Sequence, residues 1–157
     1  MAGLEDLYRE IILDHYRSPR NRGELDPPAI MAEGFNPLCG DEIKVFLMVE
    51  GDKVEDIRIS GQGCSISQSS ASMMSQAVKG KTVDEARAVI RAFKAMMTPP
   101  DPEHEADHDH DHDHDHDEAQ VKLGDLEALS GVQKFPVRIK CATLAWNTLT
   151  QAMDDAS

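Results

Sequence analysis

Alternating apolar and polar positions in the first half of the chain predict two β-strands. Apolar residues occupy every second position of residues 43–49, and the alternation returns at Ile57 and Ile59. Between these runs lies Gly51-Asp52, which suits a two-residue hairpin turn because glycine accepts the positive φ that such a turn needs. A two-stranded hairpin is only marginally stable alone. We therefore expect a third strand, which the pattern places at residues 29–34.

Apolar residues at helical spacing predict helices on both sides of these strands. Residues 4–17 form an amphipathic pattern, and residues 18–28, rich in Pro, Arg, Asn and Gly, indicate a loop. Residues 65–79 favour a second helix that stops near Gly80. The next helix is expected to open with a capping box, in which the first and last residues of Thr82-Val83-Asp84-Glu85 bond reciprocally. Its apolar stripe consists of Val83, Ala86, Ile90, Phe93 and Met97.

The C-terminal part of the chain predicts two more helices. A short one is expected at residues 123–129, and a long one at residues 136–154, with Pro136 in its first turn. Apolar side chains surround the long helix on nearly all sides, which predicts that it is largely buried. The order of helix, strands and helices indicates an α+β fold, in which a small three-stranded antiparallel sheet packs with helices on one face.

Residues 99–120 interrupt this pattern with a low-complexity segment. Six of the seven histidines lie between His104 and His116, mostly alternating with aspartate. Such a segment has no apolar face to bury, so we expect a disordered insertion within a single domain that spans residues 1–157. It has two interpretations: a solvated acidic linker, or a reservoir that binds zinc, nickel or copper loosely through imidazoles.

The charge of the chain argues against nucleic acid and anionic membranes as partners. The formal net charge is −13, but residues 101–118 hold ten of the 29 acidic residues. The remainder carries 19 acidic and 16 basic residues, so the predicted folded part is nearly neutral. Charged residues at positions 5 and 6 come too early for the apolar stretch of a signal peptide, and no run is long enough to span a membrane. We therefore expect a cytoplasmic protein.

Three cysteines are the main candidates for chemistry. In the reducing cytoplasm, an odd and small number of cysteines indicates metal binding or thiol reactivity rather than disulfides. Cys39 and Cys64 lie beside glycines, in bends where backbone can approach a bound ion closely. Cys141 lies in the last helix and, taken alone, is equally typical of a small buried core residue.

A zinc site is the simplest way to combine these thiols. Zinc prefers four tetrahedral ligands, so three cysteines leave one place. Asp41 can fill it because it lies two residues after Cys39, whereas His15, the only histidine outside the tract, has an ordinary alternative as a helix-face residue. The candidate metal ligands are therefore Cys39, Asp41, Cys64 and Cys141.

A basic residue near the last cysteine fits the charge of such a site. Three thiolates and one carboxylate around Zn²⁺ sum to −2. Arg138 lies three residues before Cys141, on the same helix face, and its guanidinium can offset that charge or bond a ligand. Lys140 is adjacent to Cys141 and is expected to point elsewhere. A solvated basic edge is the alternative interpretation of both cations.

Six stretches of the chain form recognisable motifs when taken together and in order: Leu7-Tyr8-Arg9, Asp14-His15-Tyr16, Pro19-Arg20-Asn21, Asn36-Pro37-Leu38-Cys39-Gly40-Asp41, Gly61-Gln62-Gly63-Cys64-Ser65-Ile66-Ser67 and residues 135–146. These motifs resemble the SufU family within the wider NifU/IscU-like fold. Scaffold proteins of the IscU branch carry histidine immediately before the last cysteine, whereas this chain has Lys140. The resemblance covers nearly the whole chain except the His-Asp tract.

The resemblance implies a zinc-dependent sulfurtransferase in iron–sulfur cluster assembly. Its partner would be a SufS-type cysteine desulfurase, a pyridoxal-phosphate enzyme that holds sulfur as a persulfide. Sulfur would pass to Cys39 and then to the SufBCD assembly complex, and the charge of the site makes Arg138 the second candidate catalytic residue. Two alternatives stay open: an IscU-like scaffold on which a [2Fe–2S] cluster is assembled, and a purely structural zinc protein.

Overall fold

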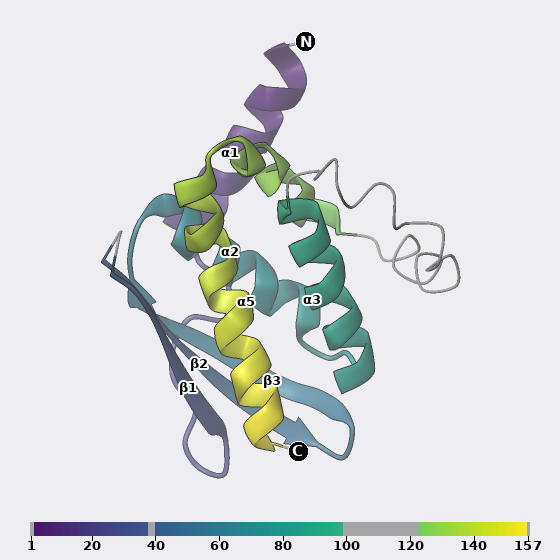
Figure 1. Ribbon diagram of the computed structural model, residues 1–157. Coiled ribbons are helices and arrows are strands. Elements are labelled where there is room, and N and C mark those ends of the chain that lie inside the picture. Colours follow the sequence, from purple (N-terminus) through teal and green to yellow (C-terminus); the bar gives the residue numbers. More distant parts are fainter. Residues whose placement is uncertain (1, 38–39, 99–122, 157) are drawn as a thin grey trace.

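A three-stranded antiparallel sheet forms one layer of the molecule. The computed structural model describes residues 2–37, 40–98 and 123–156 (Figure 1). Strands β1 (Ile30–Asn36), β2 (Asp41–Glu50) and β3 (Lys53–Gln62) lie in the order β1-β2-β3. The predicted third strand is confirmed as β1, and the predicted hairpin turn joins β2 to β3. At one end of the sheet, Asn36 is paired with Asp41.

Five helical elements accompany this sheet in the described part of the chain. Helices α1 (Ala2–Arg17), α2 (Ser65–Val78), α3 (Val83–Met97) and α5 (Pro136–Ala156) agree with the predicted helices to within a few residues. The short helix predicted at residues 123–129 is instead η2 (Gly124–Lys134), a 3₁₀ helix of 11 residues. Three buried apolar residues explain the difference, because they recur every three residues, which is the 3₁₀ period: Leu126, Leu129 and Val132.

The predicted capping box is present at the start of α3. Glu85 N–H donates to Thr82 Oγ1, and Thr82 N–H donates to Glu85 Oε1, both at 3.1 Å. The bond from the Thr82 backbone lowers the pKa of the Glu85 carboxyl, and an interaction of the Thr82 hydroxyl with that carboxyl adds to the effect. The two bonds satisfy backbone donors that a helix start otherwise leaves unpaired.

The helices cover one face of the sheet, as predicted. The inward residues of β2 and β3 are buried, whereas the alternate residues of the same strands face away from the helices. Helix α5 lies along this inner face (Figure 1). At its centre the indole of Trp146 stacks on Phe93 of α3, with ring centroids 4.3 Å apart. The core therefore ties α5 to the rest of the fold.

The start of α5 departs from the prediction that this helix is largely buried. Its later turns are buried, but Val137 is 58% exposed, and Phe135 just before the helix is 60% exposed. Cys141 lies beside Asn36, at the end of β1. The turn before Cys141 is therefore largely exposed, in contrast to the later turns of the helix.

Several predictions fall outside the described part of the chain. Cys39 and residues 99–122, which include the His-Asp tract, are not among the described residues. The disordered insertion, the single domain of residues 1–157 and metal binding by the tract stay predictions. Among the described helices, none combines the length and apolar character needed to cross a membrane.

Candidate metal centre

Three elements bring three of the four predicted ligands to one place. Asp41 is the first residue of β2, Cys64 lies between β3 and α2, and Cys141 lies near the start of α5. One carboxylate oxygen and the two sulfur atoms lie within 4.8 Å of one another. Asp41 and Cys141 are fully buried, and Cys64 is partly exposed. Of these three, only Cys64 offers a sulfur near the surface.

The backbone around Gly63 holds the Asp41 carboxylate in position. The Cys64 backbone N–H donates to Asp41 Oδ1 at 2.9 Å. A Cβ added at Gly63 would collide with the Asp41 carboxylate, and it would also press against Asp41 Cβ at 3.1 Å. Glycine at position 63 therefore leaves room for a buried carboxylate beside the two thiols.

Cys64 is held by the start of α2. It is the N-cap residue, and its Sγ accepts the Ser67 backbone N–H at 3.5 Å. The positive end of the helix dipole favours negative charge at this position. The same geometry therefore suits a thiolate that binds a cation.

Cys141 is held by a side chain that the sequence analysis did not single out. The Asn36 carboxamide Nδ2 lies 3.8 Å from Cys141 Sγ, in hydrogen-bonding geometry, and Asn36 is itself buried. Its pairing opposite Asp41 places Asn36 beside the group. In the sequence, Asn36 opens the motif that contains Cys39 and Asp41, but nothing local assigns its side chain to Cys141. An N–H donor to sulfur stabilises a thiolate and fixes its direction.

Replacing Asn36 with aspartate is expected to weaken zinc binding roughly 10-fold. The two side chains have nearly the same shape, but a carboxylate offers the Cys141 thiolate an acceptor instead of a donor. Competition with a chromophoric chelator measures the affinity, and Asn36→Ser, which keeps a shorter donor, should lose less. Equal zinc affinity in Asn36→Asp and wild type would show that this contact does not support the centre.

The donor set fits a zinc ion. Two sulfurs and one carboxylate oxygen are ligands that zinc accepts. Backbone N–H groups bond the side chains of Asp41 and Cys64 and so fix the direction of these two ligands. A fully buried carboxylate next to two thiols is costly unless a cation or hydrogen bonds compensate for it. Cys39, the fourth predicted ligand, lies two positions before Asp41 in the chain and outside the described residues.

The two cations before Cys141 both reach the surface. Arg138 and Lys140 are exposed residues in the first turns of α5. Arg138 takes part in interactions within the protein, so its side chain is not an isolated cation. Arg138 therefore lies at the surface, three residues before the Cys141 ligand.

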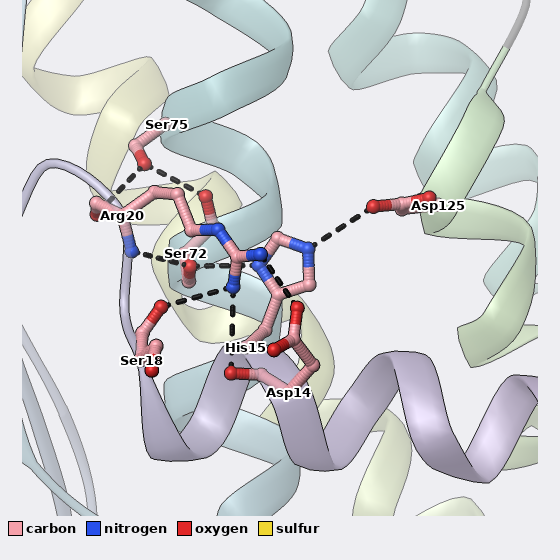
Figure 2. A network of polar contacts seen from close by, with 7 residues as sticks. All are labelled: Asp14, His15, Ser18, Arg20, Ser72, Ser75 and Asp125. Carbon is pink, nitrogen blue, oxygen red and sulfur yellow. Dashed lines mark hydrogen bonds and ion pairs between the residues drawn. The ribbon is translucent and has the colours of Figure 1, made fainter.

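His15, the alternative fourth ligand, lies elsewhere. Figure 2 shows its ring between α1, α2 and η2, where it is 1% exposed. Its Nδ1 lies 2.8 Å from Ser72 Oγ, and its Nε2 lies 3.2 Å from Asp125 Oδ2. Both ring nitrogens are thus engaged in a link between helices. The ordinary interpretation of His15 as a packed helix residue is the one that holds.

The order Ser72, His15, Asp125 resembles a nucleophile triad but is not built for catalysis. Ser72 is fully buried, and its Oγ already accepts the Arg20 backbone N–H at 2.8 Å (Figure 2). Because the Asp125 carboxylate only accepts, Nε2 of a neutral His15 carries the proton, and Nδ1 then accepts from the Ser72 hydroxyl. A substrate cannot reach this hydroxyl, so the network is structural.

Comparison with known proteins now identifies the family. The family model described as NifU-like N terminal domain matches residues 7–114. This chain belongs to the NifU-like N-terminal domain family. The resemblance to SufU proteins is confirmed by a relative in Bacillus subtilis (strain 168), named zinc-dependent sulfurtransferase SufU, which is 44% identical over 97% of this chain and 92% of its own length.

Other members of the family have scaffold names. The iron–sulfur cluster assembly scaffold protein IscU of Streptococcus pyogenes serotype M1 is 39% identical over 98% of this chain and 86% of its own length. Among solved structures, a proposed iron–sulfur cluster assembly scaffold protein for the SUF system, from Fervidobacterium islandicum AW-1, has a TM-score of 0.74. It is 29% identical and covers 92% of this chain and 94% of its own. These neighbours confirm the α+β fold.

Proposed function

We propose that this chain is a zinc-dependent sulfur carrier. It takes sulfane sulfur from a SufS-type cysteine desulfurase onto Cys39 and passes it to the SufBCD complex of iron–sulfur cluster assembly, in the cytoplasm. The observation that carries the proposal is the convergence of Asp41, Cys64 and Cys141 from three separate elements. The name of the 44% identical relative, a zinc-dependent sulfurtransferase, supports the same function.

Each residue of the centre has a distinct part in the proposal. Asp41, Cys64 and Cys141 hold the ion, and Cys39 completes the set at rest. Bound zinc keeps thiols deprotonated near neutral pH and, being redox-inert, does not oxidise a neighbouring persulfide. Cys141, on a long packed helix, suits an anchoring ligand. Cys39 lies in the β1–β2 connection beside Gly40, whose φ of 70° is a conformation that glycine adopts more readily than other residues.

The transfer itself is a thiol exchange that needs no added oxidant. The Cys39 thiolate attacks the terminal sulfur of the desulfurase persulfide, and the S–S bond within that persulfide breaks. The desulfurase cysteine leaves as a thiolate, and Cys39 carries the persulfide with its proton. One S–S bond forms for the one that is lost, so the sulfur changes carrier without net oxidation.

Arg138 is the second residue to which we assign a part in the transfer. It is exposed three residues before Cys141, and a guanidinium there offsets the net negative charge of three thiolates and a carboxylate around Zn²⁺. A further negative group, such as a persulfide, approaches more readily when that charge is compensated.

The experiment that tests the function combines metal analysis with sulfur transfer. We expect the purified chain to contain about one zinc per molecule, to raise the rate at which a SufS-type desulfurase forms alanine, and to gain one sulfur atom by mass spectrometry. Cys39→Ala should abolish both the stimulation and the mass gain. Full stimulation by Cys39→Ala would overturn the assignment of the acceptor, and a wild-type chain that neither stimulates nor gains sulfur would overturn the function.

The scaffold function is the second candidate, because two relatives named iron–sulfur cluster assembly scaffold protein IscU are 39% and 35% identical to this chain. Lys140 stands where scaffold members have histidine, and its exposed ammonium is not a ligand for an iron–sulfur cluster. Anaerobic incubation with iron and sulfide separates the two functions. A stable visible spectrum of a [2Fe–2S] cluster would favour the scaffold, and its absence the carrier.

A further inference from the structure

A groove beside Cys64 has donors that nothing in the described chain uses. Its volume is about 470 Å³. One wall consists of Tyr16, Pro19 and Arg22, around the end of α1 and the loop that follows, and the other contains Gln68 of α2; residues 61–63 also line it. Gly63, which lines the groove, lies against the Asp41 carboxylate and directly precedes Cys64, the part-exposed ligand of the three described, so the groove adjoins the centre.

Hydrogen bonds fix the position of Arg22 in this groove. The residues before and after it in the chain bond β3, since Gly23 N–H donates to Ile59 O and Ile59 N–H donates to Asn21 O, both at 2.9 Å. The guanidinium donates to Gly61 O at 3.0 Å and to Gln68 Oε1 at 3.3 Å. A guanidinium has five N–H groups, so more donors remain than these two bonds use. Arg22 is exposed and offers them at the groove.

Gln68 carries a buried polar group without a partner. The residue is 8% exposed, and its Nε2 is the one buried side-chain nitrogen or oxygen with no hydrogen bond among the described residues. Because Arg22 donates to Oε1, the carboxamide oxygen faces Arg22, and the atom without a partner is the nitrogen. Such an unpaired group lowers stability, and native proteins keep few of them without a role.

We propose that this groove binds the segment of the desulfurase that carries the persulfide, with Arg22 meeting its backbone carbonyls or carboxylates and the Gln68 amide doing so once its side chain turns into the groove. The inference rests on the proposed function. Its support is the excess of donors, which calls for a partner rich in acceptors, and the position of the groove beside Cys64. The glycines at positions 61 and 63 contribute no side chains to it, so a peptide backbone can approach closely. A segment in the groove places its cysteine next to the centre.

The test compares three variants of the zinc-loaded full chain. Arg22→Glu is expected to weaken binding to the desulfurase roughly 10-fold, measured by calorimetric titration, with unchanged zinc content. Lys53→Glu is the matched control, because it makes the same charge change at the opposite end of β3 and should bind like wild type. The carrier concentration for half-maximal stimulation should rise in parallel for Arg22→Glu alone.

Gln68→Met provides a second readout that a structural role would not give. Removing the unpaired amide should raise the melting temperature by roughly 2–4 °C, while binding to the desulfurase weakens. Gain of stability with loss of affinity is the expected signature. A lower melting temperature with unchanged affinity would make Gln68 a structural residue and overturn its part in the groove.

The remaining outcomes separate the groove from the function. If Arg22→Glu takes up sulfur at the same carrier concentration as Lys53→Glu, the groove assignment is wrong and the proposed function stands. If wild type binds the desulfurase through Arg22 but gains no sulfur, the function is wrong and the groove stands. If Arg22→Glu instead changes self-association in sedimentation, the occupant is a second copy of this chain and the proposal is overturned.

Discussion

Replacing Trp146 by alanine is expected to lower the free energy of unfolding by about 3–5 kcal/mol. The indole is fully buried and stacks on Phe93. Its N–H donates to Ser70 Oγ at 3.0 Å, and that hydroxyl donates to Ala142 O. Alanine leaves a cavity at the point where α2, α3 and α5 meet, because a close-packed core relaxes only partly around a deletion. Urea unfolding followed by circular dichroism measures the loss.

The matched control for this prediction is Trp146→Phe. Phenylalanine keeps an aromatic ring on Phe93 and loses the indole donor, so we expect a smaller loss, in part the roughly 1 kcal/mol of one hydrogen bond. Because Trp146 lies one turn or so beyond Cys141 on the same helix, the alanine variant should also hold zinc less tightly. A loss below about 1.5 kcal/mol for the alanine variant would mean that the core repacks and that this stack does not fix α5.

Replacing Cys141 by alanine is expected to weaken zinc binding by more than about 100-fold. Loss of a hydrogen bond to a metal ligand already costs roughly 10-fold to 100-fold in metal affinity, and this variant loses the ligand itself. Alanine removes a fully buried sulfur and leaves two thiolates for the ion. Zinc affinity by chelator competition gives the magnitude. Cobalt substitution adds a check, because the sulfur-to-cobalt absorption should fall when one thiolate is removed.

Asp41→Ala is the variant with which the zinc affinity of Cys141→Ala is compared. Removing the carboxylate leaves three thiolates, so that variant should retain zinc better than Cys141→Ala. Zinc affinity that is unchanged in Cys141→Ala would exclude this thiol from the centre. Unchanged zinc content and sulfur transfer in Asp41→Ala would remove the carboxylate from it.

Features that depend on neighbours along the chain were predictable from the sequence. Alternation over residues 43–49 specified β2, and Thr82 with Glu85 specified the start of α3, because backbone periodicity and capping are local. The length and type of η2 were not predicted. Its spacing of three fits both a short α-helix and a 3₁₀ helix, and packing against the neighbouring helices selects between them.

The sequence by itself named Asp41, Cys64 and Cys141 as candidates, since only certain side chains suit zinc. Only the tertiary structure decided that they meet, because their convergence depends on strand register and on where α5 lies across the sheet. It also assigned His15 to a link between helices and placed Asn36 beside Cys141 and Arg22 beside Gln68. These contacts join positions 46–110 residues apart in the chain, where no local pattern reaches.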